Sequence, residues 1–221
     1  HVSQEPTEEE WYVEYFGLKP IDWLESVGWA TSRAWIAHCI FVDDDEISRL
    51  ARWGTGVAHC PSTCCLVAGG VTRFPEMRRH GVPVGLSVDG SGCEHSSMWL
   101  EAHTALLLGR LSAGPTGMSA RDALEMGTLG SARCLGREGE LGVLAPGAGG
   151  DVVAWPLEGI RFSGAWSDPV EAWLRCGPVS ARHTIVAGKA IVEDGELRLL
   201  GLEEMLKRHD NIAREWQGAY V

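Results

Sequence analysis

Short apolar runs alternate with amphipathic stretches along the first half of the chain. Three of these runs end in a polar side chain: Ala34–His38, Gly56–His59 and Val82–Asp89. Apolar runs of this length, bounded by turn residues, are typical of buried strands. The stretches between them carry helix signals, such as Asp43 with Glu46 ahead of an amphipathic face that closes at Gly54. The alternation predicts βα units and a parallel sheet.

Helix start and stop signals place further helices around these strands. Thr7 to Glu10 has the pattern of a capping box and opens a helix that ends at Phe16-Gly17. The remaining predictions for this half are helices over Pro20–Val27, Phe74–His80 and Ser96–Leu111, and a loop over Pro61–Gly70.

The pattern changes after Gly114-Pro115. A capped helix is predicted from Ser119 to Leu135, and glycine and proline then become frequent. Strands are predicted over Asp151–Trp155, His183–Ala187 and Lys189–Glu193, the last two forming a hairpin across Gly188. A final helix is predicted over Glu203–Trp216. The second half of the chain therefore resembles a small β domain with a helical tail.

Composition narrows the possible functions. The formal net charge of −11 argues against nucleic acid as a partner, and no apolar run approaches the roughly 20 residues of a membrane span. Seven cysteines form no even framework, so we expect reduced thiols and a cytoplasmic protein.

The polar residues at the run ends are candidates for chemistry. Metal sites need His and Asp side chains that converge from separate strands, and parallel strands present their carboxyl ends at one edge. Asp89 follows an apolar run and precedes a glycine-rich loop, where an unpaired carboxylate would be costly to bury. His1 and His38 are further candidates, although a terminal His is commonly exposed and His38 could be a core histidine. His59 is as well explained by a hydrogen bond at the mouth of the sheet.

Longer motifs resemble a known family. The runs Ala37–Cys39, Gly54–Ser62 and Val82–Ser91 resemble the amidohydrolase superfamily, closest to its purine, pterin and triazine aminohydrolases and especially 8-oxoguanine deaminase-like proteins. Supporting segments are Phe16–Pro20, Leu129–Arg137 and Cys176–Pro178. The resemblance implies an α/β fold: the C-terminal half of a metal-dependent (β/α)8 TIM barrel plus part of a small β-sandwich domain. Its expected segments are barrel strands five to eight with their helices (1–137), the β domain (138–200) and a helical tail (201–221).

The same resemblance implies roles for individual residues. His1 and Asp89 would bind one divalent metal, most simply zinc, with iron or manganese as alternatives. Hydroxide generated at the metal would attack the amine-bearing ring carbon of 8-oxoguanine, guanine or a pterin. His38 and Asp89 are the expected catalytic residues, Asp89 carrying the proton to the leaving ammonia. Gln4, His38 and His59 are the expected substrate contacts, and a homo-oligomer is the expected assembly.

Several departures from the family pattern leave alternatives open. Gln4 stands where relatives have a glutamate that protonates the ring, and the strand-one His-x-His pair is not in this chain. Thr63–Leu66 replaces a Ser-Asn segment, and Glu94-His95 replaces an Asn-Asp pair. A non-catalytic or impaired homologue, or an azine chlorohydrolase, would also fit. With half a barrel present, we expect an open apolar strand edge along Val82–Val88.

Overall fold

The computed structural model describes residues 1–90 and 96–218, in two compact units. The first unit contains His1–Gly149 and Leu157–Val179, and the second contains Gly150–Pro156 and the chain from Ser180 onward. These units do not coincide with the expected segments, because residues 138–149 and 157–179 belong to the first unit.

Helix α9 (Pro169–Cys176) explains the difference. It was not predicted, and it buries Ala172, Trp173 and Leu174. The indole N–H of Trp99 in α6 (Met98–Ala113) donates to the carbonyl of Trp173 (2.9 Å). Apolar burial and this hydrogen bond hold residues 157–179 on the first unit.

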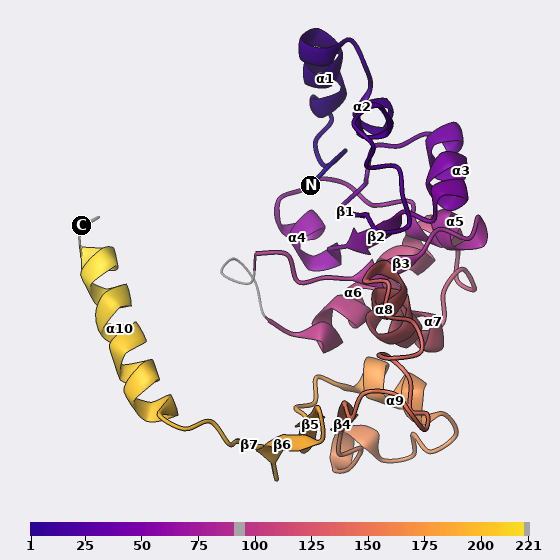
Figure 1. The fold of residues 1–221 in the computed structure, drawn as a ribbon. Helices are drawn as coiled ribbons and strands as arrows, with labels where there is room; N and C mark the ends of the chain where they lie inside the picture. The colour runs from indigo at the N-terminus through magenta and orange to yellow at the C-terminus, as the bar shows by residue number, and fades with distance from the viewer. Residues whose placement is uncertain (91–95, 219–221) are drawn as a thin grey trace. The chain divides into compact units, whose positions relative to one another are not determined.

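A three-stranded parallel sheet forms the centre of the first unit (Figure 1). Its strands are β1 (Trp35–Ala37), β2 (Gly56–His59) and β3 (Val84–Leu86), in that order. Ile36 pairs with Val57, and Val57 pairs with Val84. Val2 adds a parallel bridge to His38, beside β1. The predicted parallel arrangement is confirmed.

Within residues 1–90 and 96–218, ten helical segments besides α9 belong to the first unit with this sheet. They are α1 (Glu8–Phe16), α2 (Pro20–Ser26), α3 (Asp44–Trp53), α4 (Pro61–Leu66), α5 (Phe74–Arg79), α6, α7 (Ala120–Glu125), the π-helix η1 (Met126–Gly130), α8 (Ser131–Cys134) and the 3₁₀ turn η2 (Ile160–Phe162).

Of the capping boxes predicted at the starts of α1 and α3, the structure contains the one at α3. Asp43 and Glu46 form the capping box of α3, as predicted, and α3 buries Ile47 and Leu50. Thr7 makes no side-chain cap bond, so the predicted box at α1 is wrong. Thr7 already has helical backbone angles, which turn its hydroxyl away from the capping position. The carboxylate of Glu8 instead accepts from the Gln4 backbone N–H (2.7 Å).

The predicted loop over Pro61–Gly70 is also wrong in its first part, because Pro61–Leu66 is helix α4. Proline at the first helical position has its backbone angle preset for a helix. The buried carboxylate of Glu101, from α6, accepts the Ser62 N–H (3.1 Å) at the helix start. The local proline signal and a contact between distant residues therefore act together at the start of this helix.

The outer edge of β3 is covered by η1 and α8. Pro83 and Ser87 use their backbone groups to pair with β2, which directs the polar groups of Val84 and Leu86 outward. The Ser131 hydroxyl accepts the Leu86 N–H (3.2 Å), and a Cβ on Gly130 would lie 2.2 Å from the Val84 carbonyl oxygen. The expectation of an open edge over Val82–Val88 is therefore wrong at Val84 and Leu86.

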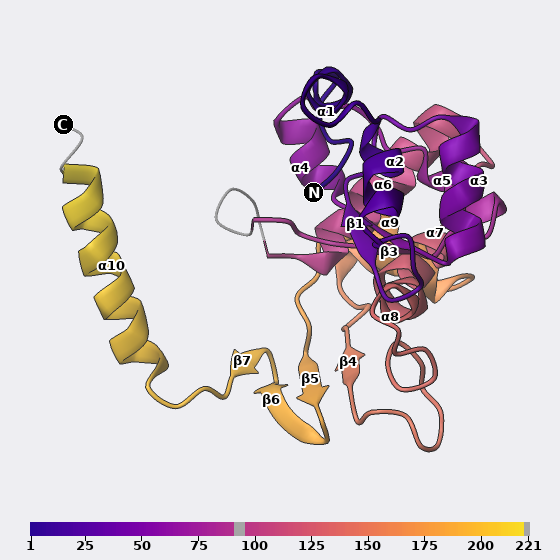
Figure 2. The same cartoon turned by 45° about the horizontal axis from the view of Figure 1, so that its top comes forward.

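The second unit is a four-stranded antiparallel sheet followed by a helix (Figure 2). Its elements are β4 (Val152–Ala154), β5 (His183–Val186), β6 (Lys189–Glu193), β7 (Glu196–Leu197) and α10 (Leu202–Gly218). The predicted hairpin across Gly188 is confirmed. No described side chain of this unit is buried.

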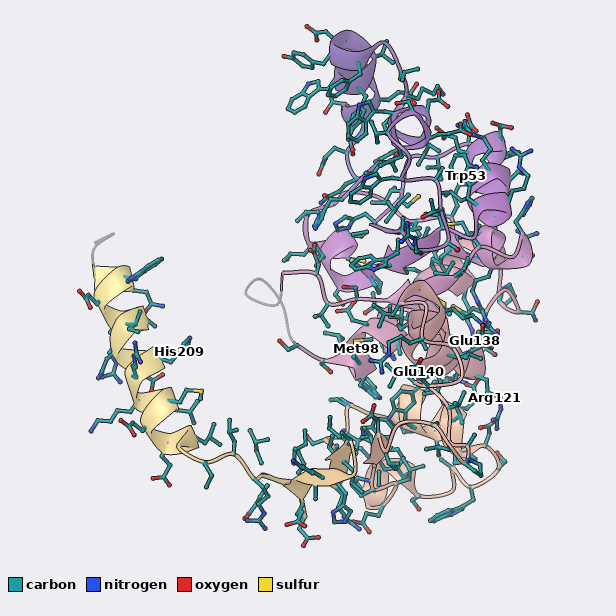
Figure 3. The ribbon with its side chains drawn as sticks, viewed as in Figure 1. Trp53, Met98, Arg121, Glu138, Glu140 and His209 are labelled. Atoms are coloured by element: carbon teal, nitrogen blue, oxygen red, sulfur yellow. The ribbon has the colours of Figure 1, made fainter. Side chains whose placement is uncertain are left out.

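Helix α10 has an apolar stripe at helical spacing. The stripe consists of Leu202, Met205, Leu206, Ile212 and Trp216. Side chains project from all around this helix in Figure 3, where His209 is labelled. In the part of the chain that the structure describes, no helix combines the length and apolar character that crossing a membrane requires.

Candidate metal centre

Three predicted site residues meet at the carboxyl ends of the parallel strands. One ligand atom from each of His1, His38 and Asp89 lies within 4.8 Å of the other two. His38 Nε2 lies 3.0 Å from His1 Nδ1 and 3.7 Å from Asp89 Oδ2. Two imidazoles and a carboxylate therefore face one another at a single point.

The backbone around this cluster is unusual. His38 has φ 67°, Asp89 has φ 53°, and Ser3 and Cys39 have φ 53° and 51°. Non-glycine residues rarely adopt this left-handed region, and those that do are often at functional sites. His38 is held by the Thr72 hydroxyl, which donates to its carbonyl (2.8 Å), and by its own N–H, which donates to Ala58 (3.1 Å). These bonds offset the cost of the strained angle.

The electrostatics favour a neutral His38. It is fully buried, and burial lowers its pKa, while the charge of Asp89 acts in the opposite direction. A neutral imidazole keeps one nitrogen with a free lone pair and one that donates. An imidazole nitrogen and a carboxylate oxygen are donors that suit zinc, iron or manganese, and His1 and Asp89 supply them beside His38. The residues present therefore fit a divalent cation.

His59 is not part of this cluster. Its side chain is fully buried and stacks on Phe74 of α5, with ring centroids 4.5 Å apart and planes inclined by 24°. Among the described residues, neither ring nitrogen has a hydrogen-bond partner. Burial, with a smaller effect of His38, lowers the pKa of His59 to about 3. The hydrogen bond expected for His59 is therefore not found.

Gln4 is half-buried and lies in the segment between His1 and α1. Its backbone N–H is committed to Glu8, and its side chain is not a member of the three-residue cluster. The predicted substrate contact at Gln4 thus stays a prediction. Residues 91–95, which include Glu94 and His95, lie outside the described residues.

Two neighbours of His38 were not predicted as site residues. The sulfur of Cys64 lies 3.9 Å from His38 Nδ1, and the Thr72 hydroxyl holds the His38 carbonyl. In the sequence, Cys64 stood out only as part of a departure from the family pattern, and no sequence motif identified Thr72 as a neighbour of the site. Burial raises the pKa of the Cys60 thiol to about 11 and that of Cys64 to about 12, so both are neutral thiols.

The sequence of this chain is similar to a known protein family. The model of the amidohydrolase family matches residues 1–191. The chain is 41% identical over 210 residues to 8-oxoguanine deaminase from Pseudomonas aeruginosa, covering 95% of this chain and 46% of that protein. It is 29% identical over 231 residues to an isoxanthopterin deaminase from an unknown prokaryotic organism, covering 97% and 48%. The chain thus spans about half the length of these relatives.

The fold of this chain is also similar to solved structures. Atrazine chlorohydrolase from Arthrobacter aurescens TC1, complexed with zinc, superposes with a TM-score of 0.84 at 30% identity, covering 92% of this chain and 46% of that one. An adenosine deaminase from Xanthomonas campestris with bound zinc superposes with a TM-score of 0.90 at 24% identity, covering 99% and 49%. The predicted fold class, an α/β chain with the architecture of the C-terminal part of a TIM barrel, is confirmed.

Proposed function

The chain belongs to the amidohydrolase family, and from that premise we propose that it carries the metal-binding and proton-transfer side of a hydrolytic deaminase. The substrate is an aminated heterocycle of the 8-oxoguanine, guanine or pterin class. The observation that carries the proposal is the convergence of His1, His38 and Asp89 within 4.8 Å. The similarity to an 8-oxoguanine deaminase and an isoxanthopterin deaminase supports the substrate class.

His1 and Asp89 are the residues of this chain that would hold the metal. Zinc is the proposed ion, supported by the two similar proteins that were crystallised with it. A divalent ion held there would supply Lewis acidity and lower the pKa of a water molecule. Asp89 would accept a proton from the attacking water and deliver it to the leaving amine.

His38 and Gln4 would act on the substrate. His38 Nε2 faces the cluster and stabilises the oxygen that attacks the ring carbon, or the substrate itself, through a hydrogen bond. Gln4 can donate a hydrogen bond to a ring nitrogen, but an amide cannot give up a proton as a carboxylic acid does. We therefore expect slower turnover than a glutamate at this position would support.

The test uses the intact protein loaded with zinc. Ammonia release is measured on 8-oxoguanine, guanine and a pterin, and zinc content is measured on the same preparation. Zinc-dependent release of ammonia from at least one of these compounds is the expected result. Tight binding of the heterocycles without turnover would instead identify a non-catalytic homologue.

The second candidate is an azine chlorohydrolase. The structural similarity to atrazine chlorohydrolase favours it, since 92% of this chain superposes on that enzyme. A chlorinated triazine in the same assay distinguishes the two, because this reaction releases chloride in place of ammonia. Chloride release without ammonia release from any of the heterocycles would establish the second candidate.

The cellular setting is also a proposal. Among the described residues, Cys39, Cys60, Cys64, Cys134 and Cys176 are free thiols, which supports a reducing compartment such as the cytoplasm. We propose a homo-oligomer with no nucleic-acid partner, in line with the acidic composition. Light scattering of the intact protein gives the oligomeric state directly.

A further inference from the structure

The imidazole of His38 is contacted at both of its nitrogens. Nε2 faces His1 Nδ1 at 3.0 Å and Asp89 Oδ2 at 3.7 Å, while Nδ1 faces Cys64 Sγ at 3.9 Å. Both His38 and Cys64 are buried, at 0% and 2% exposure. Water is thus largely excluded from the Nδ1 side, and the Cys64 thiol lies next to that nitrogen.

We propose that Cys64 is a positioning residue that fixes the tautomer of His38. Its S–H donates to Nδ1, so the ring proton resides on Nε2 and points into the cluster. His38 is then a hydrogen-bond donor toward the reacting atoms, and the metal is left to His1, Asp89 and residues outside this chain. The catalytic part of this inference rests on the proposed function, whereas the tautomer does not.

The atoms around Nε2 support this assignment. An ionised Asp89 carboxylate can only accept a hydrogen bond, and the Nδ1 atom of His1 can accept one as well. A proton on Nε2 therefore meets acceptors, while a lone pair there would face the carboxylate oxygen without a proton between them. On the opposite side, a neutral thiol can donate its single proton to the Nδ1 lone pair.

The reverse tautomer would change the site. If Nδ1 carried the proton and donated to sulfur, the Nε2 lone pair would be free to bind the cation, and His38 would become a third ligand from this chain. A partner on the distal nitrogen decides which nitrogen of a histidine is available for a metal. Cys64 therefore determines whether His38 donates to the substrate or ligates the metal.

The fold holds the thiol in place for this task. Cys64 lies on α4, and its N–H donates to the Cys60 carbonyl (3.0 Å). The start of α4 is fixed from another element by the bond between Ser62 N–H and Glu101. The carbonyl of His38 is fixed by Thr72, so the ring and the thiol are positioned from separate parts of the chain.

Nitrogen NMR on the intact protein, labelled with ¹⁵N-histidine, tests the tautomer directly. Spectra are recorded with zinc and after chelation, and His38 is assigned by its loss in His38→Gln. Wild-type protein and Cys64→Ser, whose hydroxyl can also donate, should show the proton on Nε2. Cys64→Ala and Cys64→Val, which have no donor, should lose that preference. Cys65→Ala is the matched control on the same helix and should leave the spectrum unchanged.

Turnover provides the second measurement. Cys64→Ala should lower kcat by about 10- to 100-fold, as loss of a partner of a site histidine commonly does, and Cys64→Ser should restore most of it. A proton on Nδ1 in the wild type, or an unchanged tautomer in both Cys64→Ala and Cys64→Val, overturns the inference. If the tautomer responds as stated but none of the heterocycles is deaminated, the proposed function fails and the positioning role of Cys64 stands.

Discussion

His38 and His59 lie at the carboxyl ends of neighbouring parallel strands, and both are fully buried. Their surroundings nevertheless differ. His38 lies within hydrogen-bond distance of His1 and belongs to the three-residue cluster. His59 stacks on Phe74, with no partner for its ring nitrogens among the described residues. The same sequence pattern, a histidine after an apolar run, has two different outcomes.

The backbone explains the difference. His59 is still inside β2, opposite Leu86, so its side chain follows the strand alternation and shares a face with Val57. His38 lies just beyond β1 with φ 67°, which interrupts the alternation. Asp89 also lies beyond its strand in the left-handed region. A polar residue near a strand end therefore reaches this site when it lies beyond the last residue of the strand, as His38 and Asp89 do, and not when it is still inside the strand, as His59 is.

The largest effect is expected from Asp89→Asn. The amide keeps the shape of the side chain but loses the charge that attracts a cation and the basic oxygen that accepts a proton. Zinc content should fall and turnover should drop by orders of magnitude, measured by metal analysis and ammonia release. Asp45→Asn, an exposed carboxylate on α3, is the control and should change neither. Full zinc occupancy with near-native turnover would remove Asp89 from the site.

The comparison itself is tested by His38→Gln and His59→Phe. His38→Gln should lower kcat by about 10²- to 10⁴-fold, the usual contribution of a side chain that donates or transfers a proton at the reacting centre. His59→Phe places an apolar ring against Phe74 and should leave kcat within a few-fold of wild type. Steady-state kinetics of the two variants show whether His38 alone, or His59 as well, contributes to turnover. Equal losses would mean that both strand ends serve the site.

A gain is expected from Gln4→Glu. A carboxylic acid at this position could protonate a ring nitrogen, so kcat on 8-oxoguanine, guanine or a pterin should rise at least about tenfold. Glu5→Gln is the matched control, because it changes the neighbouring carboxylate, which is exposed where Gln4 is half-buried. If Glu5→Gln abolished activity while Gln4→Glu changed nothing, the acid would be Glu5.

The smallest effect concerns stability and pH. The pKa of His59 is about 3 in the folded protein, below its ordinary value of 6.5, so the unfolded chain binds the proton more readily. This contribution to stability is complete above pH 6.5 and is lost as the pH falls below it, by about 1.4 kcal/mol per pH unit. Thermal melts between pH 7 and pH 5 should show a smaller decrease in Tm for His59→Phe than for the wild type. Parallel curves for the two proteins would contradict this account.

Much of the fold could be predicted from local sequence. The bounds of β2 and β6 agree with the predicted ranges, because apolar runs and flanking glycines define them. Asp43 and Glu46 are a self-contained signal for the start of α3. His1, His38 and Asp89 were selected because polar residues end apolar runs and because a family resemblance supported them.

Other features depend on contacts between distant parts of the chain. Helix α4 depends in part on Glu101, and the left-handed angle at His38 depends in part on the Thr72 hydroxyl. No local pattern specifies on which face of β2 the His59 ring lies. The face depends on whether His59 is still inside the strand, and the structure places it as the last residue of β2. For the same reason, the thiol of Cys64 could not be placed beside His38 before α4 was known.

Helical segments η1 and α8 cover the outer edge of β3, and this has a consequence for self-association. A strand edge with unpaired backbone groups is a template on which another molecule can add a strand and begin an aggregate. Ser131 occupies the Leu86 N–H, and Gly130 lies too close to Val84 for an added strand to reach that carbonyl. Two small residues, Gly130 and Ser131, thereby cover the outward backbone groups of Val84 and Leu86, and Ser131 lies 45 residues along the chain from the Leu86 N–H that it binds.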